Sequence, residues 1–210
     1  MSSVPKSRRE EHDFMASHNL REIRKRVTEM AINDFGYDRD RLEEKIKKFE
    51  DSLVNIEPER KAEIVARMRK KNESYYADFV DEETEVTRDL LRKAVCEFEL
   101  GNSIFPSGDA RLMEYCEKRK HLDMAVGWLF CLKQELQYIA ETLPGDKNRF
   151  ESLTGYEDDK ECEGAKKRKG AIEIEIALIK GVRRAANKFL KAESEKKTRQ
   201  KKNNNTAEKK

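Results

Sequence analysis

The residues best suited to bind another molecule are the lysines and arginines near the C-terminus. Residues 164–210 contain 16 Lys and Arg against 5 Asp and Glu, a net charge of +11, whereas residues 1–163 contain 29 against 37, a net charge of −8. Cationic side chains neutralise phosphates and release counterions, so a basic end on an acidic body indicates an acidic partner, most often nucleic acid. The candidate nucleic-acid-binding residues are Lys166, Lys167, Arg168, Lys169, Arg183, Arg184, Lys188, Lys191, Lys196, Lys197 and Arg199.

The spacing of these cations favours a helix that follows a phosphate backbone. Arg184, Lys188 and Lys191 lie three or four residues apart, so they share one face of a helix. Residues 166–169 open the predicted last helix, where the helix dipole disfavours cations, and this is weak support for an external anion. Phe189 is the one aromatic residue among the charges, so base stacking is not expected. A basic end that only keeps the chain soluble explains the same residues equally well.

The search for catalytic or metal-binding patterns is negative. Histidine occurs as His12, His18 and His121, and none of them belongs to an H-E-x-x-H or E-x-x-H pattern, which excludes the usual helical zinc site and the di-iron bundle signature. Neither a phosphate-binding glycine loop nor G-x-S-x-G occurs. The acidic run over 81–85 is interpreted as a solvated helix face rather than a metal site. We therefore expect a non-catalytic protein without a metal or a cofactor.

The apolar residues are spaced as in helices. The longest stripe follows Asp109, with apolar residues three, four or seven positions apart, as on a helix that is buried along one side. Its members are Leu112, Tyr115, Leu122, Val126, Leu129, Leu132, Leu136, Ile139 and Leu143. We expect this helix to end near Thr142. Gly101 is expected to close the preceding helix in the left-handed conformation, so that residues 102–108 form a turn.

Further helices are predicted on both sides of this one. They cover about 10–33, 40–53, 58–98, 149–153 and 166–190. Gly36 is expected to end the first of them in the left-handed conformation. Pro58 suits the first turn of the third, which is either unbroken or interrupted at 72–74.

The expected fold class is all-α, an up-down helical bundle with a four-helix core. Charged residues make up 41% of the chain and apolar residues 37%, with 9 Gly and 4 Pro, a composition that suits amphipathic helices better than strands. The bundle domain is expected to span 10–191, with a helical insertion at about 35–75. Residues 1–9 are predicted to be a flexible arm. Residues 192–210 are predicted to be a disordered basic tail, because they lack apolar anchors.

Cysteine usage and hydropathy indicate where the protein resides. Cys96, Cys116, Cys131 and Cys162 are scattered without a C-x-x-C pattern, so we expect reduced and mostly buried thiols. No apolar stretch of 18 residues occurs, and the N-terminus lacks an apolar signal region. We expect a cytoplasmic protein with no membrane partner.

Several segments resemble a known family. They are Asn102, Ser103, Ile104, Phe105, Pro106 and Ser107, then 117–122, 132–139 and the N-terminal 4–9. Together they resemble bacterial four-helix-bundle proteins encoded beside reverse transcriptases, the best understood being the accessory variability determinant of diversity-generating retroelements. The resemblance covers about 90–191 and the short arm. It implies a non-catalytic bundle that oligomerises into a barrel and binds the reverse transcriptase and template RNA during mutagenic cDNA synthesis.

The leading hypothesis follows from this resemblance and from the basic end. We expect a non-catalytic accessory protein, a possible homo-oligomer, whose partners are a reverse transcriptase and RNA or RNA/DNA. Because the body is acidic, the expected RNA contact moves to the C-terminal end. The alternative is a helical scaffold or regulator for protein–protein interaction, whose basic tail only aids solubility.

Overall fold

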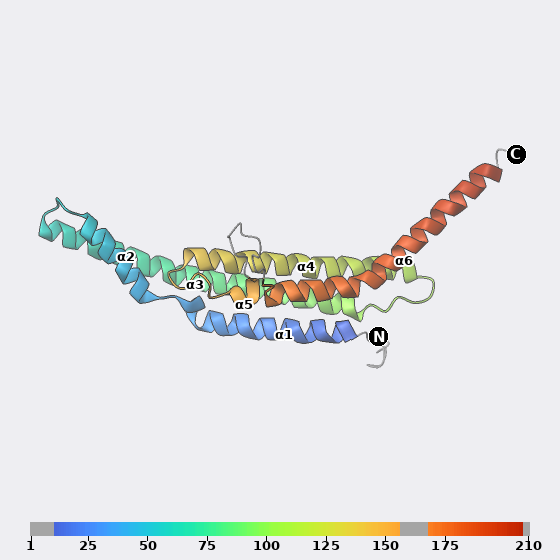
Figure 1. Ribbon diagram of the computed structural model, residues 1–210, viewed down its shortest axis with the longest axis horizontal. Coiled ribbons are helices and arrows are strands. Elements are labelled where there is room, and N and C mark those ends of the chain that lie inside the picture. The colour runs from blue at the N-terminus through green and yellow to red at the C-terminus, as the bar shows by residue number, and fades with distance from the viewer. Residues whose placement is uncertain (1–10, 156–167, 208–210) are drawn as a thin grey trace.

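The molecule is built from helices. The computed structural model describes residues 11–155 and 168–207, and it places no side chains for 11–14, 185, 197 and 199–207. Its elements are α1 (Glu11–Ile32), the 3-10 helix η2 (Asp34–Gly36), α2 (Arg39–Ser52), α3 (Pro58–Ser103), α4 (Arg111–Thr142), α5 (Glu151–Thr154) and α6 (Ala171–Ala207). Every element within the described ranges is a helix, so the all-α prediction is confirmed (Figure 1). The predicted arm over 1–9 lies outside the described residues.

Four long helices lie side by side and form the body of the molecule. α1 packs against α3 and α6, and α4 packs against the same two helices, so the four surround one core. Successive long helices run in opposite directions, as the colours in Figure 1 show. Neighbouring antiparallel helices joined in this way can each bury one apolar stripe.

α4 contributes the largest share of the core. The predicted stripe is buried at Leu122, Val126, Leu129, Leu132, Leu136, Ile139 and Leu143. Leu112 and Tyr115 are only half-buried, because they lie in the first turns of α4, where Tyr115 stacks on Phe189 of α6 with the ring centroids 4.3 Å apart. The predicted end of this helix near Thr142 is confirmed.

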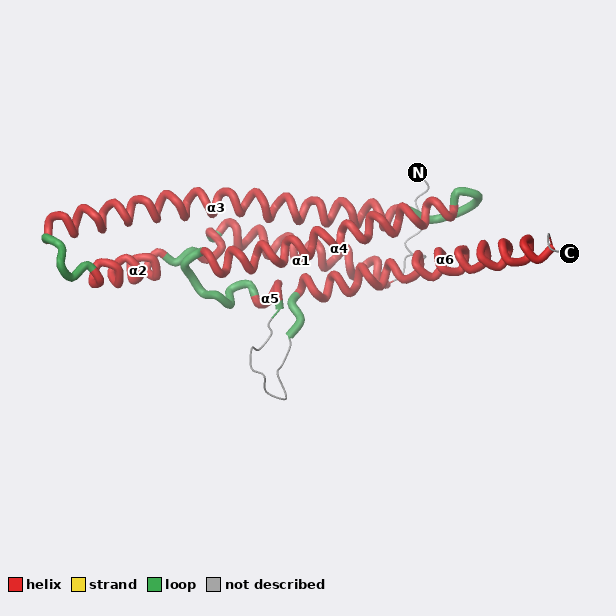
Figure 2. The backbone as a smooth tube through the Cα atoms, turned by 90° about the horizontal axis from the view of Figure 1, so that it is seen from above, coloured by secondary structure: helices red, strands yellow, loops and turns green. Residues whose placement is uncertain are grey.

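The first part of the chain after α1 forms an arm that projects from the bundle (Figures 1 and 2). The arm consists of α2 and the N-terminal half of α3, and it has a small apolar cluster of its own, made of Leu42, Ile46 and Val65. α3 is one unbroken helix of 46 residues, about 70 Å long. Neither Gly nor Pro occurs between Pro58 and Gly101, so nothing in the backbone favours the alternative break at 72–74.

The prediction that Gly101 closes α3 is wrong. Gly101 lies inside the helix, which continues through Asn102 and Ser103, so the turn begins at Ile104. A glycine is needed at this buried position for a different reason. A Cβ atom there would lie 3.1 Å from Cγ of Leu122, so the missing side chain lets α3 and α4 approach closely.

The predicted bounds of the last helix are also corrected. α6 begins at Ala171 rather than near Lys166, and it ends at Ala207 rather than near Leu190. Residues 192–207, which we expected to be disordered, are helical. Lys, Glu, Arg, Gln and Ala are strong helix formers, and no Gly or Pro occurs after Gly181, so the helix propagates without an apolar face.

Arg149 holds together the junction where α1, α2 and α4 meet. Its Nη2 donates to the carbonyl oxygens of Ile139, at 2.9 Å, and of Leu143, also at 2.9 Å, which satisfies the open C-terminal end of α4. Its Nη1 donates to the carbonyl of Gly36 at 3.3 Å. Gly36 has φ of 71°, so its predicted left-handed conformation is confirmed. Burial lowers the pKa of Arg149, as expected for a guanidinium that faces carbonyl groups instead of water.

The prediction that the cysteines are mostly buried is wrong for the three that the structure describes, although these three are free thiols as expected. Cys96, Cys116 and Cys131 are free and exposed, because each lies beside the apolar stripe of its helix rather than on it. Cys162 lies outside the described residues. No helix in the described part of the chain is long and apolar enough to cross a membrane.

Candidate nucleic-acid interface

The cations of α6 are brought to the surface by the way this helix packs. Its apolar face, with Ile172, Ile176 and Ile179, is buried in the core, so cations on the other side of the helix face outward. Between Ile176 and Ala192 the helix contains five Lys or Arg and no Asp or Glu. Every charged residue on this segment is therefore positive.

Three of the predicted residues form a free basic row. Arg184, Lys188 and Lys191 are exposed, and none of them has an ion pair with another described residue. They lie three and four residues apart on one helix, so their positively charged groups can meet successive phosphates of one strand. These three residues are the ones we call the α6 basic row.

The other predicted residues differ in their availability. Arg183 is half-buried and forms an ion pair with Asp123, so it fastens α6 to α4 instead of facing a partner. Lys196 pairs with Glu193 at 2.8 Å on the solvent side of the helix. Arg168 and Lys169 are exposed but precede the helix, contrary to the prediction that they open it. Lys166 and Lys167, and the side chains of Lys197 and Arg199, lie outside the described part of the chain.

A shallow apolar groove connects the two groups of cations. Its volume is about 440 Å³, and its floor is formed by Ile174, Leu178 and Gly181, with Lys169 at one end and Arg184 at the other. A Cβ atom on Gly181 would contact nothing within 4 Å, so this part of α6 is open. The surface thus runs from a cation just before α6, across an apolar stretch, to a cation on the helix.

Phe189 is engaged by its neighbours. It stacks on Tyr115, and the guanidinium of Arg111 lies 4.7 Å from the centroid of its ring. The ring therefore contributes to the contact between α4 and α6. A ring engaged in this way is not free to stack on a base.

The turn that carries the family resemblance lies at the end of the bundle from which α6 projects (Figure 1). Nζ of Lys118 donates to the carbonyl of Ile104 at 3.3 Å and lies 5.6 Å from the ring centroid of Phe105. The backbone N–H of Ser107 donates to the carboxylate of Glu114 at 2.8 Å. The turn is thus fixed to the first turns of α4. Asn102 is buried, and its Oδ1 accepts no hydrogen bond.

Buried carboxylates are the polar feature that the sequence did not reveal. Glu83 was predicted to be solvated with the rest of the acidic run, but it is buried, and its burial and the nearby Glu135 raise its pKa to about 7. Glu175 of α6 is fully buried, and burial raises its pKa to about 8. The apolar neighbours of Glu175 in an Ile-Glu-Ile-Glu-Ile run were the sequence signal that could have predicted its burial.

No group of three or more potential metal ligands occurs among the described residues.

His121 has a structural contact. Its Nδ1 lies 2.7 Å from a carboxylate oxygen of Glu97, so the pair joins α4 to α3.

No family model, curated protein or solved structure matches the chain.

Proposed function

We propose that this protein is a non-catalytic accessory subunit of a reverse transcriptase that binds nucleic acid along the exposed side of α6. The observation that carries the proposal is the α6 basic row, which has three neighbouring cations with no acidic partner among the described residues. The row lies on a body whose net charge is negative, so the attraction for an anion is confined to this end of the molecule.

The reverse transcriptase enters the proposal through the family resemblance. The segment from Asn102 to Pro106 carries that resemblance, and its C-terminal part is anchored to α4 close to the place where α6 leaves the bundle. A protein partner bound at this turn would lie next to nucleic acid bound on α6. The protein would then hold template RNA or RNA/DNA beside the enzyme without taking part in the chemistry.

The nucleic-acid role is tested by a filter-binding titration with a structured RNA at two salt concentrations. Changing Arg184, Lys188 and Lys191 to Gln should weaken binding and reduce the salt slope by about 2 to 3, because each lost phosphate contact accounts for about 0.7 to 0.9 of that slope. The matched control changes three exposed lysines of α2 to Gln and removes the same charge from the arm. They are Lys45, Lys47 and Lys48.

The control decides whether the position of the charge matters. Equal losses in the two triple variants would show that only net charge matters, and the role of α6 would be wrong. The proposal predicts that a reverse transcriptase is encoded beside the gene of this protein, and the partner is tested by size-exclusion chromatography of the two gene products together. We expect the two to elute together, and separate elution at micromolar concentrations would contradict that part of the proposal.

A protein-interaction scaffold is the second candidate, and a surface of α4 favours it. Met124, Phe130 and Tyr138 are between 37% and 48% exposed, although large apolar side chains of a bundle are usually covered. Gly127 lies among them, and a Cβ atom there would contact nothing within 4 Å, so another helix could approach closely. If neither triple variant binds RNA differently from the unchanged protein, this scaffold function is the better explanation.

A further inference from the structure

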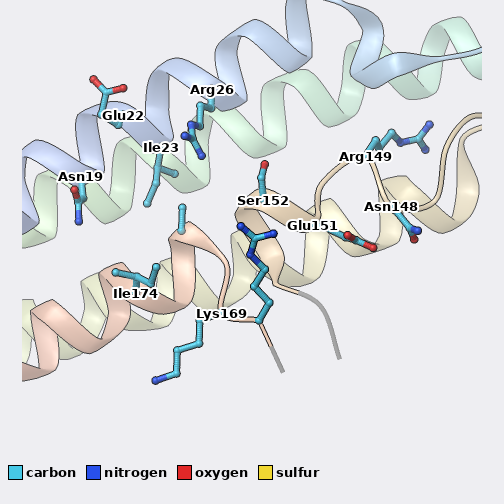
Figure 3. Close-up of a pocket in the computed structure, with 12 residues that line it drawn as sticks. Asn19, Glu22, Ile23, Arg26, Asn148, Arg149, Glu151, Ser152, Lys169 and Ile174 are labelled. Atoms are coloured by element: carbon cyan, nitrogen blue, oxygen red, sulfur yellow. The ribbon is translucent and has the colours of Figure 1, made fainter. Parts of the chain in front are cut away.

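A cleft lies at the N-terminal end of α6, whereas the α6 basic row lies further along the same helix. It is bounded by α1, by the segment 148–152 and by residues 168–174, and its volume is about 750 Å³ (Figure 3). This size lies within the range of pockets that hold small organic ligands. Arg26 of α1 lines the cleft, and so do Arg168 and Lys169 of the segment before α6.

These three cations are available for a ligand. Arg26, Arg168 and Lys169 are exposed, and none of them forms an ion pair with another described residue. The fourth cation of the cleft, Arg149, already donates to backbone carbonyls. Two carboxylates, Glu22 and Glu151, also line the cleft and leave it with an excess of positive charge.

The backbone that carries Arg168 and Lys169 is held in place. Gly155 and Gly170 lie so close that a Cβ atom on Gly155 would be 2.9 Å from the amide nitrogen of Gly170 and 2.9 Å from the carbonyl oxygen of Arg168. Glu173, in the first turn of α6, pairs with Lys133 on α4 at 2.5 Å, so its carboxylate does not neutralise the cleft. The two cations therefore project from a fixed backbone position.

The first turn of α6 adds backbone donors to the same place. Ala171 lines the cleft, and the amides at this end of the helix precede the first intrahelical hydrogen bond, which runs from the amide of Ile174 to the carbonyl of Gly170 at 3.1 Å. Unpaired amides and the helix dipole favour a negative charge here. Asn19 and Ser152 supply neutral polar groups on the α1 and α5 sides.

We infer that this cleft binds a compact polyphosphate group. Figure 3 shows Arg26 on α1 and Lys169 on the segment before α6, with the side chain of Lys169 extending away from Ser152 at the outer edge of the cleft. Because Arg26, Arg168 and Lys169 are spread along the cleft in this way, they fit a chain of phosphates better than a single anion. Guanidinium groups bind phosphate oxygens in pairs, which gives the site its geometry. Such a group occurs in a free nucleoside triphosphate and at the 5′ end of an unprocessed RNA.

The nucleic-acid source of the ligand rests on the proposed function, whereas the polyphosphate chemistry rests on the cleft alone. The first measurement is therefore isothermal titration calorimetry with sodium tripolyphosphate and the full chain. We expect binding that Arg26→Gln, Arg168→Gln and Lys169→Gln together weaken by at least about tenfold, since a hydrogen bond to a charged group is worth on the order of 1.5 kcal/mol or more. Absence of a binding heat with the unchanged protein overturns the inference.

The matched control removes three cations that lie outside the cleft, by changing Arg21 and Lys25 of α1 and Lys180 of α6 to Gln. This variant should keep its affinity for tripolyphosphate, and a loss equal to that of the cleft variant would overturn the inference. If circular dichroism shows that the cleft variant has lost helix, Arg26→Gln alone replaces it, because this exposed residue lies on the surface of α1. An unchanged affinity in that single variant also counts against the cleft.

The second measurement identifies the source of the phosphates. The same RNA is titrated with a 5′-triphosphate and with a 5′-hydroxyl end. Tighter binding of the triphosphate form, lost in the cleft variant but kept in the variant of the α6 basic row, supports an RNA end. Binding of tripolyphosphate with no preference between the two RNAs supports a free nucleotide, and this result stands even if the basic row has no role.

Discussion

Glu175 should make the stability of the bundle fall as the pH rises. Its side chain is fully buried between α6 and α1, and neither carboxylate oxygen has a hydrogen-bond partner. Burial raises its pKa from 4.5 to about 8, while the nearby Asn19 acts in the opposite direction without completing a well-formed hydrogen bond. Since ionisation would leave an unpaired charge in the core, the folded protein keeps this carboxyl protonated at neutral pH.

The sign and size of the effect follow from linkage. The folded chain binds this proton more tightly than the unfolded chain, so the stabilisation is fully present below about pH 4.5 and is lost as the pH rises through about 8. Each pH unit inside this window changes the free energy of unfolding by about 1.4 kcal/mol. Between pH 5 and pH 8, Glu175 should therefore lower the free energy of unfolding by about 3 to 4 kcal/mol.

Urea denaturation at these two pH values measures the effect. Glu175→Gln keeps the shape of the side chain and removes its titration, so its free energy of unfolding should fall about 3 to 4 kcal/mol less than that of the unchanged protein. Glu83 titrates in both proteins and cancels from the comparison. Glu195→Gln, at an exposed position of the same helix, is the control and should follow the unchanged protein. Equal pH dependence in all three proteins would refute the reasoning about Glu175.

Three other changes test the packing. Leu129→Ala should cost about 2–5 kcal/mol in urea denaturation, because Leu129 is fully buried on α4, and a loss below half a kcal/mol would show that the core has been misplaced. Gly101→Val should destabilise the protein by more than a typical surface change, about 1 kcal/mol or more, because its side chain would collide with Leu122; a neutral result in thermal unfolding would contradict the close approach of α3 and α4. Gly145→Ala should lower the melting temperature, because its Cβ would overlap Nη1 of Arg149 and displace the guanidinium from the end of α4, and an unchanged melting temperature would contradict this capping role.

Helical periodicity was a good guide to the fold because it reports which face of a helix is covered. The stripe around Leu129, the helix start at Pro58 and the left-handed Gly36 all depend on local rules, and the structure has each of them. Gly101 was misjudged because a glycine near the expected end of a helix has two explanations. One is a left-handed closing residue and the other is a close contact with a distant helix, and only tertiary structure separates them.

The candidate sites were predicted less completely than the fold. The α6 basic row could be found from spacing alone, but the pairing of Arg183 with Asp123 depends on two residues that are 60 positions apart. The cleft combines α1 with the segment before α6, so no local pattern contains it. The buried Glu175 shares its sequence pattern with exposed glutamates, and its burial results from the packing of α1 against α6.

The separate apolar cluster of the arm leads us to expect that α3 belongs to two cooperative units. The main core and the arm cluster share Tyr37 and Tyr76, whose ring centroids are 5.6 Å apart, and these two rings are the apolar link between them. Amide hydrogens before Tyr76 can exchange with solvent when the arm alone opens, whereas those near Leu91 and Phe98 exchange only when the whole bundle unfolds. We therefore expect one half of this uninterrupted helix to exchange its amide hydrogens readily and the other half to be protected, although the backbone is continuous.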